Sequence, residues 1–128
     1  MSQEKYDILV AEDDDQISYL LNFILTREGF SVKIANDGQE AMDAIAAISQ
    51  PKLVLLDIMM PHYNGFELID HIRKKTSWGD VPIVMITAKS QEQDIVRALE
   101  SGANDYVVKP FQPGELIARL KAVMEKVA

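Results

Sequence analysis

Residues that could carry out metal or phosphoryl chemistry stand at the ends of apolar runs in this sequence. They are three successive acids after the first run, an aspartate after a central run, and a threonine and a lysine that end two later runs: Glu12, Asp13, Asp14, Asp57, Thr87 and Lys109. If the runs are parallel strands, their carboxyl ends meet at one edge of a sheet, where open α/β folds bind ligands. We therefore expect these side chains to converge on one site.

Such a site would be strongly acidic and would need a cation. Carboxylates ~4 Å apart repel by about 4 kcal/mol per pair at an effective dielectric constant near 20, so a divalent ion and the Lys109 ammonium would have to offset the repulsion. Oxygen-only ligands favour Mg²⁺, with Mn²⁺ as an alternative. A carboxylate beside Mg²⁺ can attack a phosphoryl group whose oxygens are held by the metal, by Lys109 and by the Thr87 hydroxyl. We therefore expect Asp57 to accept a phosphoryl group.

The elements that must position these residues alternate between strands and helices. Apolar runs and period-two alternation predict strands at 6–12, 30–35, 53–56, 81–87 and 105–109. Apolar residues at helical spacing predict helices that begin near residues 15, 38, 66, 91 and 113. Five strands that alternate with five helices indicate an α/β fold with a doubly wound parallel sheet, covered on both faces. Because we find no internal linker, residues 1–128 are expected to form one domain.

The predicted fourth helix, at 91–101, differs from the others because its apolar stripe is thin. The stripe consists of Ile95, Ala98 and Leu99. A helix with few buried contacts opens locally at low cost in free energy. We therefore expect this helix to be weakly anchored.

Composition excludes several classes of protein. The chain has no cysteine, which excludes a disulfide framework and a thiolate metal site. A net charge of −7 and a pI near 4.7 argue against nucleic-acid binding by this domain. The first residues are polar, and no apolar run approaches the ~20 residues of a membrane helix. We therefore expect no signal peptide, no membrane association and a cytoplasmic location.

Four segments, in this order, resemble the receiver domain of two-component response regulators over essentially the whole chain. They are ILVAEDDD, LLDIMMP with Gly65 four residues past Pro61, ITA and DYVVKPF. The resemblance implies a flavodoxin-like strand order 2-1-3-4-5, as in chemotaxis receivers. It also implies that Asp57 accepts a phosphoryl group from a phosphohistidine of a sensor histidine kinase or of a histidine phosphotransfer protein. Such a domain catalyses its own phosphotransfer and dephosphorylation and is not an enzyme with turnover.

The resemblance also assigns metal-binding roles to individual residues. Asp57 matches the phosphoacceptor, which also contacts the metal. Asp13 matches the carboxylate that binds Mg²⁺ directly, and Glu12 matches its acidic companion, which acts through water. Met59 matches the residue whose backbone carbonyl coordinates the metal, so its side chain is expected to be free of constraint.

The remaining assignments concern the phosphoryl group and its effect on the fold. Thr87 and Lys109 match the pair that holds the phosphoryl group, and the bond from Lys109 to Pro110 is usually cis in this family. Tyr106 matches an aromatic switch that turns into space vacated by Thr87 and alters the face formed by the fourth helix, fifth strand and fifth helix. Lys89 matches a position that tunes the access of water to the phosphoryl group.

A finer resemblance links the run RALESGANDYVVKPFQPGELIARLK to receivers that are attached to winged-helix DNA-binding domains. It implies a homodimer that forms through the last two helices on phosphorylation, with these residues on the dimer face: Arg97, Glu100, Asp105, Glu115, Arg119 and Lys121. Asn104 replaces an acid common in that group, which would weaken the dimer. Under this alternative, the chain is the receiver of a transcription factor whose output domain lies outside the sequence.

Three rival functions share part of the pattern. A haloacid-dehalogenase-like phosphatase also uses an Asp nucleophile, but it needs a second acid two residues later, where Met59 cannot donate a proton. A flavodoxin-like cofactor binder would have a phosphate loop after the first strand, where the acids of this chain would repel a phosphate. A degenerate receiver that only binds partners would normally have lost Asp57 or Lys109, and both are present.

Overall fold

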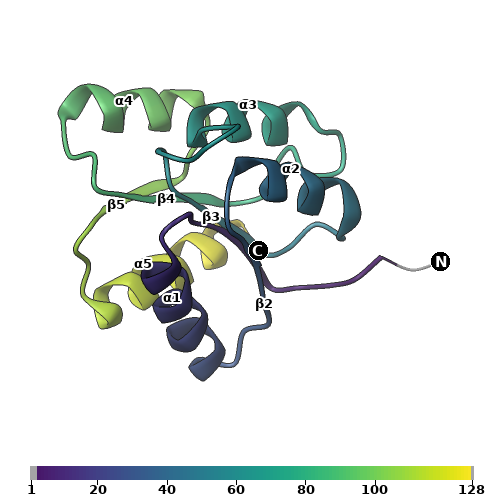
Figure 1. Cartoon of the computed structure of the whole chain (residues 1–128), viewed down its shortest axis with the longest axis horizontal. Coiled ribbons are helices and arrows are strands. Elements are labelled where there is room, and N and C mark those ends of the chain that lie inside the picture. The colour runs from purple at the N-terminus through teal and green to yellow at the C-terminus, as the bar shows by residue number, and fades with distance from the viewer. Residues whose placement is uncertain (1–2, 128) are drawn as a thin grey trace.

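The computed structural model describes residues 3–127, which are organised around a five-stranded parallel sheet (Figure 1). The strands lie in the order β2-β1-β3-β4-β5, and all neighbours are parallel. Their bounds are β1 (Ile8–Ala11), β2 (Val32–Ala35), β3 (Leu53–Leu56), β4 (Ile83–Thr87) and β5 (Asp105–Val108). The expected parallel sheet and the strand order implied by the resemblance are both confirmed.

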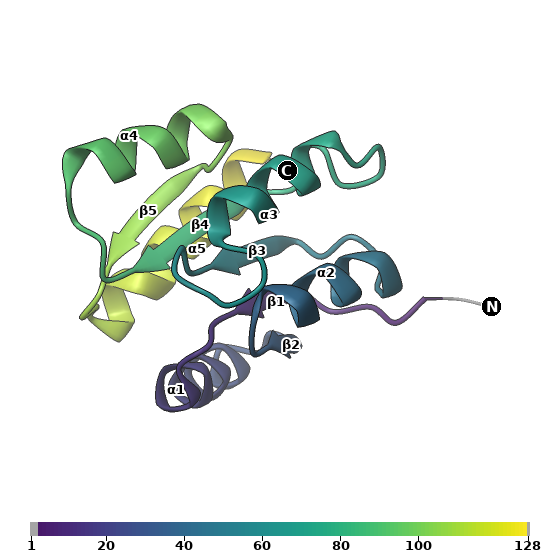
Figure 2. The same ribbon diagram turned by 45° about the horizontal axis from the view of Figure 1, so that its top comes forward.

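Helices cover both faces of the sheet, as Figures 1 and 2 show. One face carries α1 and α5, and the other carries α2, α3 and α4. The helix bounds are α1 (Asp15–Arg27), α2 (Gly38–Ala47), α3 (Gly65–Lys74), α4 (Glu92–Ser101) and α5 (Pro113–Val127). This is the doubly wound architecture that the alternation of apolar patterns predicts.

The apolar run of the central strand β3 is uninterrupted because the strand is buried on both faces of the sheet. Val54 and Leu56 belong to the core cluster beneath α2, α3 and α4, whereas Leu53 and Leu55 belong to the cluster beneath α1 and α5. All four side chains are fully buried because successive residues of a strand point to opposite faces. The strand therefore holds Asp57 on a rigid support at the edge of the sheet.

Three strands begin later than predicted, at residues 8, 32 and 83 instead of 6, 30 and 81. Before the first two strands, the N–H of Asp7 donates to the Ser31 hydroxyl and the N–H of Ser31 donates to the Asp7 carboxylate, both at 2.9 Å, in addition to backbone bonds to the Ser31 carbonyl. At the third, Pro82 has no N–H to donate to a ladder. The carboxyl ends of the strands, which carry the candidate site, lie within one residue of their predicted positions.

The helix α4 has few buried contacts, as its thin stripe predicts. Within α4, all of whose residues are described, Ala98 is the one buried residue, and Leu99 is 45% exposed. Its N-cap residue Gln91 makes no side-chain capping bond within the described chain. At the other end, the Arg73 guanidinium of α3 donates to the Gly102 carbonyl at 2.7 and 3.1 Å. The end of α4 nearest the candidate site is therefore the less firmly attached end.

Candidate functional site

The acids that follow β1 and the aspartate that follows β3 meet at the carboxyl edge of the sheet. Glu12, Asp13 and Asp57 each place a carboxylate oxygen within 4.8 Å of the others. The register explains this convergence, because Ala11 pairs with Leu56 and the next residues of both strands therefore emerge side by side. The structure brings these three acids together as the sequence predicts.

Asp14, the next acid along, is used differently. Its carboxylate caps α1 by accepting hydrogen bonds from the N–H groups of Gln16 at 2.9 Å and Ile17 at 3.1 Å. Such a cap satisfies helix N–H groups that otherwise have no partner. Asp14 therefore fixes the start of α1, and with it the turn that carries Glu12 and Asp13.

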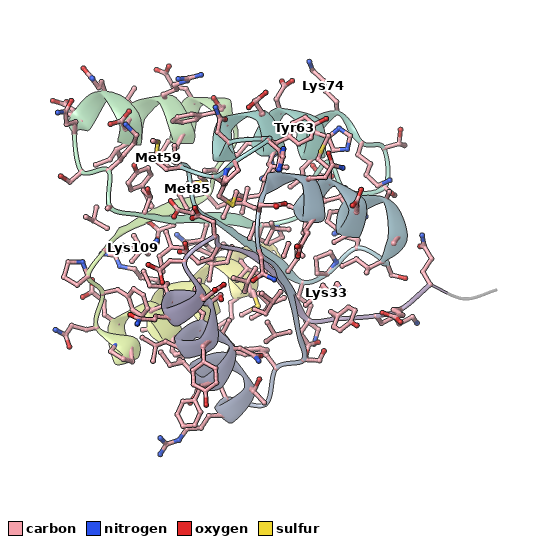
Figure 3. The ribbon with its side chains drawn as sticks, viewed as in Figure 1. Lys33, Met59, Tyr63, Lys74, Met85 and Lys109 are labelled. Carbon is pink, nitrogen blue, oxygen red and sulfur yellow. The ribbon has the colours of Figure 1, made fainter. Side chains whose placement is uncertain are left out.

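Lys109 follows β5, which is separated from β3 by β4 in the sheet, and its side chain is labelled in Figure 3. Its Nζ donates to Asp57 Oδ2 at 2.9 Å and forms an ion pair with Glu12 Oε1 at 2.5 Å. The side chains of Lys109, Asp57 and Glu12 are only 12%, 7% and 0% exposed, so water screens these charges little. The bond between Lys109 and Pro110 is cis, as the resemblance implies.

The buried surroundings of Glu12 strongly affect its ionisation. Burial raises the pKa of Glu12 to about 7, and the charge of Asp57 adds to this effect. The Lys109 ammonium and the Asp14 N–H, which donates to Oε2 at 3.1 Å, lower the pKa but do not overcome burial. Although Lys109 lies in ion-pair contact, Oε1 has no hydrogen bond of good geometry among residues 3–127.

The donor set suits a hard divalent cation. Burial lowers the pKa of Lys109, but its bonds to Glu12 and Asp57 outweigh burial and raise that pKa above its usual value, so the side chain stays cationic. One ammonium therefore faces a cluster of three carboxylates. The under-coordinated Glu12 oxygen and the oxygen-only ligands match the preferences of Mg²⁺. Glu12, Asp13 and Asp57 are the side chains that could hold the ion.

Met59 lies beside the acceptor through its backbone. Its N–H is 3.4 Å from Asp57 Oδ1, at the long limit of a hydrogen bond. Its side chain is 60% exposed, and Figure 3 places it at the same end of the sheet as Lys109. The backbone N–H of Met59 therefore lies next to the acceptor, and coordination of a metal by its carbonyl stays a prediction.

Thr87 and Tyr106 are linked through the backbone of Lys89. Thr87 ends β4 with a buried side chain, and its Oγ1 lies 3.4 Å from the Lys89 N–H. The Tyr106 hydroxyl donates to the Lys89 carbonyl at 2.8 Å, and burial raises the pKa of Tyr106 to about 12. Sequence reasoning did not identify the Lys89 carbonyl as a partner, because no side-chain pattern marks a backbone acceptor. Thr87 and Tyr106 are therefore connected by hydrogen bonds through the backbone of one residue in the loop between β4 and α4.

The residues predicted for a dimer face lie on α4, β5 and α5, and several make contacts within the chain. Arg119 forms an ion pair with Asp105 at 3.3 Å. Lys121 reaches Glu28 of α1 at 3.0 Å, and the Arg97 guanidinium stacks on an aromatic ring of α3. Glu100 and Glu115 are exposed. Exposed ion pairs contribute little free energy and exchange readily, so a dimer through this face stays a prediction.

The sheet order and the acidic site with its lysine define the class of the protein. The family model of the response regulator receiver domain matches residues 8–121. The chain belongs to this family, which confirms the resemblance seen in the sequence. Receivers act as phosphoacceptors and switches, bind Mg²⁺ at an acidic site and interact with histidine kinases.

Individual relatives are similar over almost the whole chain. The phosphate regulon transcriptional regulatory protein PhoB of Escherichia coli is 42% identical over 121 residues, which are 94% of this chain and 52% of that regulator. The DNA-binding response regulator MtrA of Mycolicibacterium smegmatis is 42% identical over 126 residues, 98% of this chain and 54% of that regulator. A CheY-like receiver structure from Methanospirillum hungatei superposes with a TM-score of 0.88 at 28% identity, covering 97% of each chain.

The chain thus spans about half the length of the curated relatives it matches. Both relatives are regulators of transcription or DNA-binding proteins by name, and the activities of their other halves belong to those proteins. Among the described helices of this chain, none is both long enough and apolar enough to cross a membrane.

Proposed function

We propose that this domain receives a phosphoryl group on Asp57 from a phosphohistidine of a partner protein, and that this event switches its α4-β5-α5 face. The observation that carries the proposal is the short contact between the Lys109 ammonium and Asp57 Oδ2, at 2.9 Å, inside a buried cluster of acids. A buried ammonium held against one carboxylate is placed to meet the charge of a group transferred to that carboxylate.

In the transfer, an oxygen of the Asp57 carboxylate forms a bond to phosphorus as the bond between phosphorus and the histidine nitrogen breaks. The electron pair of that bond stays on the imidazole of the partner. Lys109 compensates charge on one phosphoryl oxygen, and the Thr87 hydroxyl donates to another. A bound Mg²⁺, held by Glu12, Asp13, Asp57 and the Met59 carbonyl, would neutralise the remaining charge.

The phosphoryl group then acts on the fold through Thr87. Movement of Thr87 toward the phosphoryl group would release the Lys89 loop, whose carbonyl accepts from the Tyr106 hydroxyl at 2.8 Å. Tyr106 would turn inward, and the lightly attached end of α4 would follow. This is a two-state element biased by a local change of charge.

Partners follow from this chemistry. The donor is a sensor histidine kinase or a histidine phosphotransfer protein, and the compartment is the cytoplasm. The output is a DNA-binding domain of the winged-helix class, which the similarity to PhoB and MtrA supports. Residues 1–128 serve as one receiver domain, which dephosphorylates itself and does not turn over a substrate, since Met59 replaces the acid that a phosphatase would need.

Intact mass after incubation with acetyl phosphate and Mg²⁺ tests the proposal. The native chain should gain one phosphoryl group, and Asp57→Asn should gain none. Glu92→Gln, which changes an exposed carboxylate on α4, should behave as the native chain. An unmodified native chain, or equal modification of Asp57→Asn, would refute the assignment.

The proposed dimer has its own test. Sedimentation with beryllofluoride and Mg²⁺, which mimic an acyl phosphate, should raise the mass of the native chain toward that of two copies. Arg119→Ala should reduce this association by removing a cation from the α5 face. An unchanged mass in the presence of the mimic would exclude phosphorylation-promoted dimerisation.

A further inference from the structure

The turn between β2 and α2 presses against the loop that follows Asp57, as Figure 2 shows. The N–H of Gly38, the first residue of α2, donates to the Pro61 carbonyl at 3.1 Å. The carboxylate of Asp37, which caps α2, lies 4.0 Å from Nε2 of His62. Two successive residues of the turn therefore contact two successive residues of the loop.

Gly38 permits this contact because it has no side chain. A Cβ at Gly38 would lie 2.0 Å from the Tyr63 carbonyl oxygen and 2.5 Å from the Tyr63 nitrogen. These are backbone atoms, so no rotation of a side chain could relieve the overlap. Gly29 and Gly102 have a left-handed backbone, but Gly38 does not. The requirement for glycine at Gly38 therefore comes from the close approach of the loop.

A displacement of Tyr63 would also move the backbone near the acceptor, because a hydrogen bond joins the two ends of the loop. The Gly65 N–H donates to the Ile58 carbonyl at 2.9 Å, which joins the two ends of the loop. Gly65 is also packed against the acceptor, since a Cβ there would lie 2.5 Å from the Asp57 carbonyl oxygen. His62 already has a φ of 72°, so the loop has little freedom to yield by a backbone adjustment at that residue.

We propose that Gly38 is a positioning residue for the phosphoryl-acceptor site. By allowing the turn to seat against Pro61 and Tyr63, it fixes the loop that sets the backbone of Met59 beside Asp57. This inference rests on the proposed function of Asp57, and it adds a residue of the β2–α2 turn to the machinery at the end of β3. Gly38 acts through the loop and does not touch the phosphoryl group.

Gly38→Ala tests the inference, with Gly114→Ala as the matched control. Both glycines lie in the first turn of a helix, but among the described residues nothing lies within 4 Å of a Cβ built at Gly114. Both substitutions should therefore affect helix propensity similarly, and only the first should displace the loop. The readouts are the Mg²⁺ dissociation constant from calorimetry without a phosphodonor, the initial rate of labelling by acetyl phosphate, and the thermal unfolding temperature.

We expect Gly38→Ala to weaken Mg²⁺ binding by about fivefold and to slow labelling by at least about tenfold, since small misplacements of reacting groups are costly. Gly114→Ala should stay within about twofold of the native chain in both readouts. A Gly38→Ala protein that unfolds at a lower temperature but binds Mg²⁺ and is labelled as the native chain would overturn the inference, because Gly38 would then have a purely structural role.

A second variant covers the case in which Gly38→Ala does not fold. Pro61→Ala introduces no overlap and loosens the same loop, so it should slow labelling by about threefold with a folded chain. If whichever of Gly38→Ala and Pro61→Ala folds is labelled at the rate of the native chain, the positioning role is contradicted. Failure of the native chain itself to be labelled would instead refute the function of Asp57, so the two results are distinguishable.

Discussion

Replacing the buried carboxyl of Glu12 should change how the stability of the metal-free domain depends on pH. The pKa of Glu12 is raised from 4.5 to about 7 in the folded chain, mainly by burial. Below pH 4.5 the carboxyl is neutral in both the folded and the unfolded state. Between pH 4.5 and 7 the unfolded chain releases the proton while the folded chain keeps it, so the free energy of unfolding falls as the pH rises.

The size of this effect follows from the same pKa. A difference between 4.5 and about 7 corresponds to about 3 kcal/mol, as an upper bound, of stability lost by the time the pH passes 7. In Glu12→Gln the group cannot ionise, and its side-chain oxygen can still accept from the Asp14 N–H. The decline between pH 4.5 and 7 should therefore be largely absent in this variant.

Urea unfolding of both proteins at several pH values, in the presence of a chelator, measures this slope. Added Mg²⁺ at pH 7.5 should also stabilise the native chain more than Glu12→Gln, because the ion offsets the buried charge. The matched control is Glu92→Gln on the exposed face of α4. If Glu12→Gln and the native chain lose stability in parallel between pH 4.5 and 7, burial of Glu12 does not control the electrostatics of the site.

Three further predictions concern other residues of the domain. Lys109→Met should slow labelling by acetyl phosphate by about a hundredfold, because it removes the donor 2.9 Å from Asp57; a rate within threefold of native would contradict this role. Lys89→Ala should change the half-life of the phosphorylated chain more than the rate of its formation, and equal effects on both, measured by mass spectrometry, would argue against it. Arg73→Met should lower the free energy of unfolding by about 2–4 kcal/mol, because the Gly102 carbonyl and its neighbours lose their donor; a urea midpoint like that of native protein would show that these bonds contribute little.

The fold and the centre of the site follow from short-range patterns. The apolar run 53–56 and the alternation of strand and helix periods are properties of neighbouring residues, and they are enough to predict a parallel sheet. A parallel sheet then forces the residues after β1 and β3 to one edge, so the proximity of Glu12 and Asp57 follows from topology. The strand order was available from the resemblance alone, because no local pattern determines which strands are neighbours.

Contacts between distant residues could not be predicted in the same way. The sequence places Arg73 near the end of a helix. It does not predict that the guanidinium donates a hydrogen bond to the Gly102 carbonyl, 29 residues away. Asn104 comes just before β5, and its Oδ1 accepts a hydrogen bond from the Ile83 N–H at 2.9 Å. Trp78 lies in a polar loop, but its side chain is fully buried in the core beneath α2, α3 and α4. These contacts depend on how distant loops are arranged in space, and the periodicity of apolar residues in the sequence does not predict that arrangement.

Chemical trapping of the modified residue tests the central claim most directly. Borohydride reduces an acyl phosphate to an alcohol, so an aspartyl phosphate is recovered as homoserine. After incubation with acetyl phosphate and Mg²⁺ and then with borohydride, peptide sequencing by mass spectrometry should find homoserine at Asp57, and only when the phosphodonor is present. Homoserine at Asp13 or at another acid instead of Asp57, or no homoserine in a folded and Mg²⁺-saturated chain, would contradict the account.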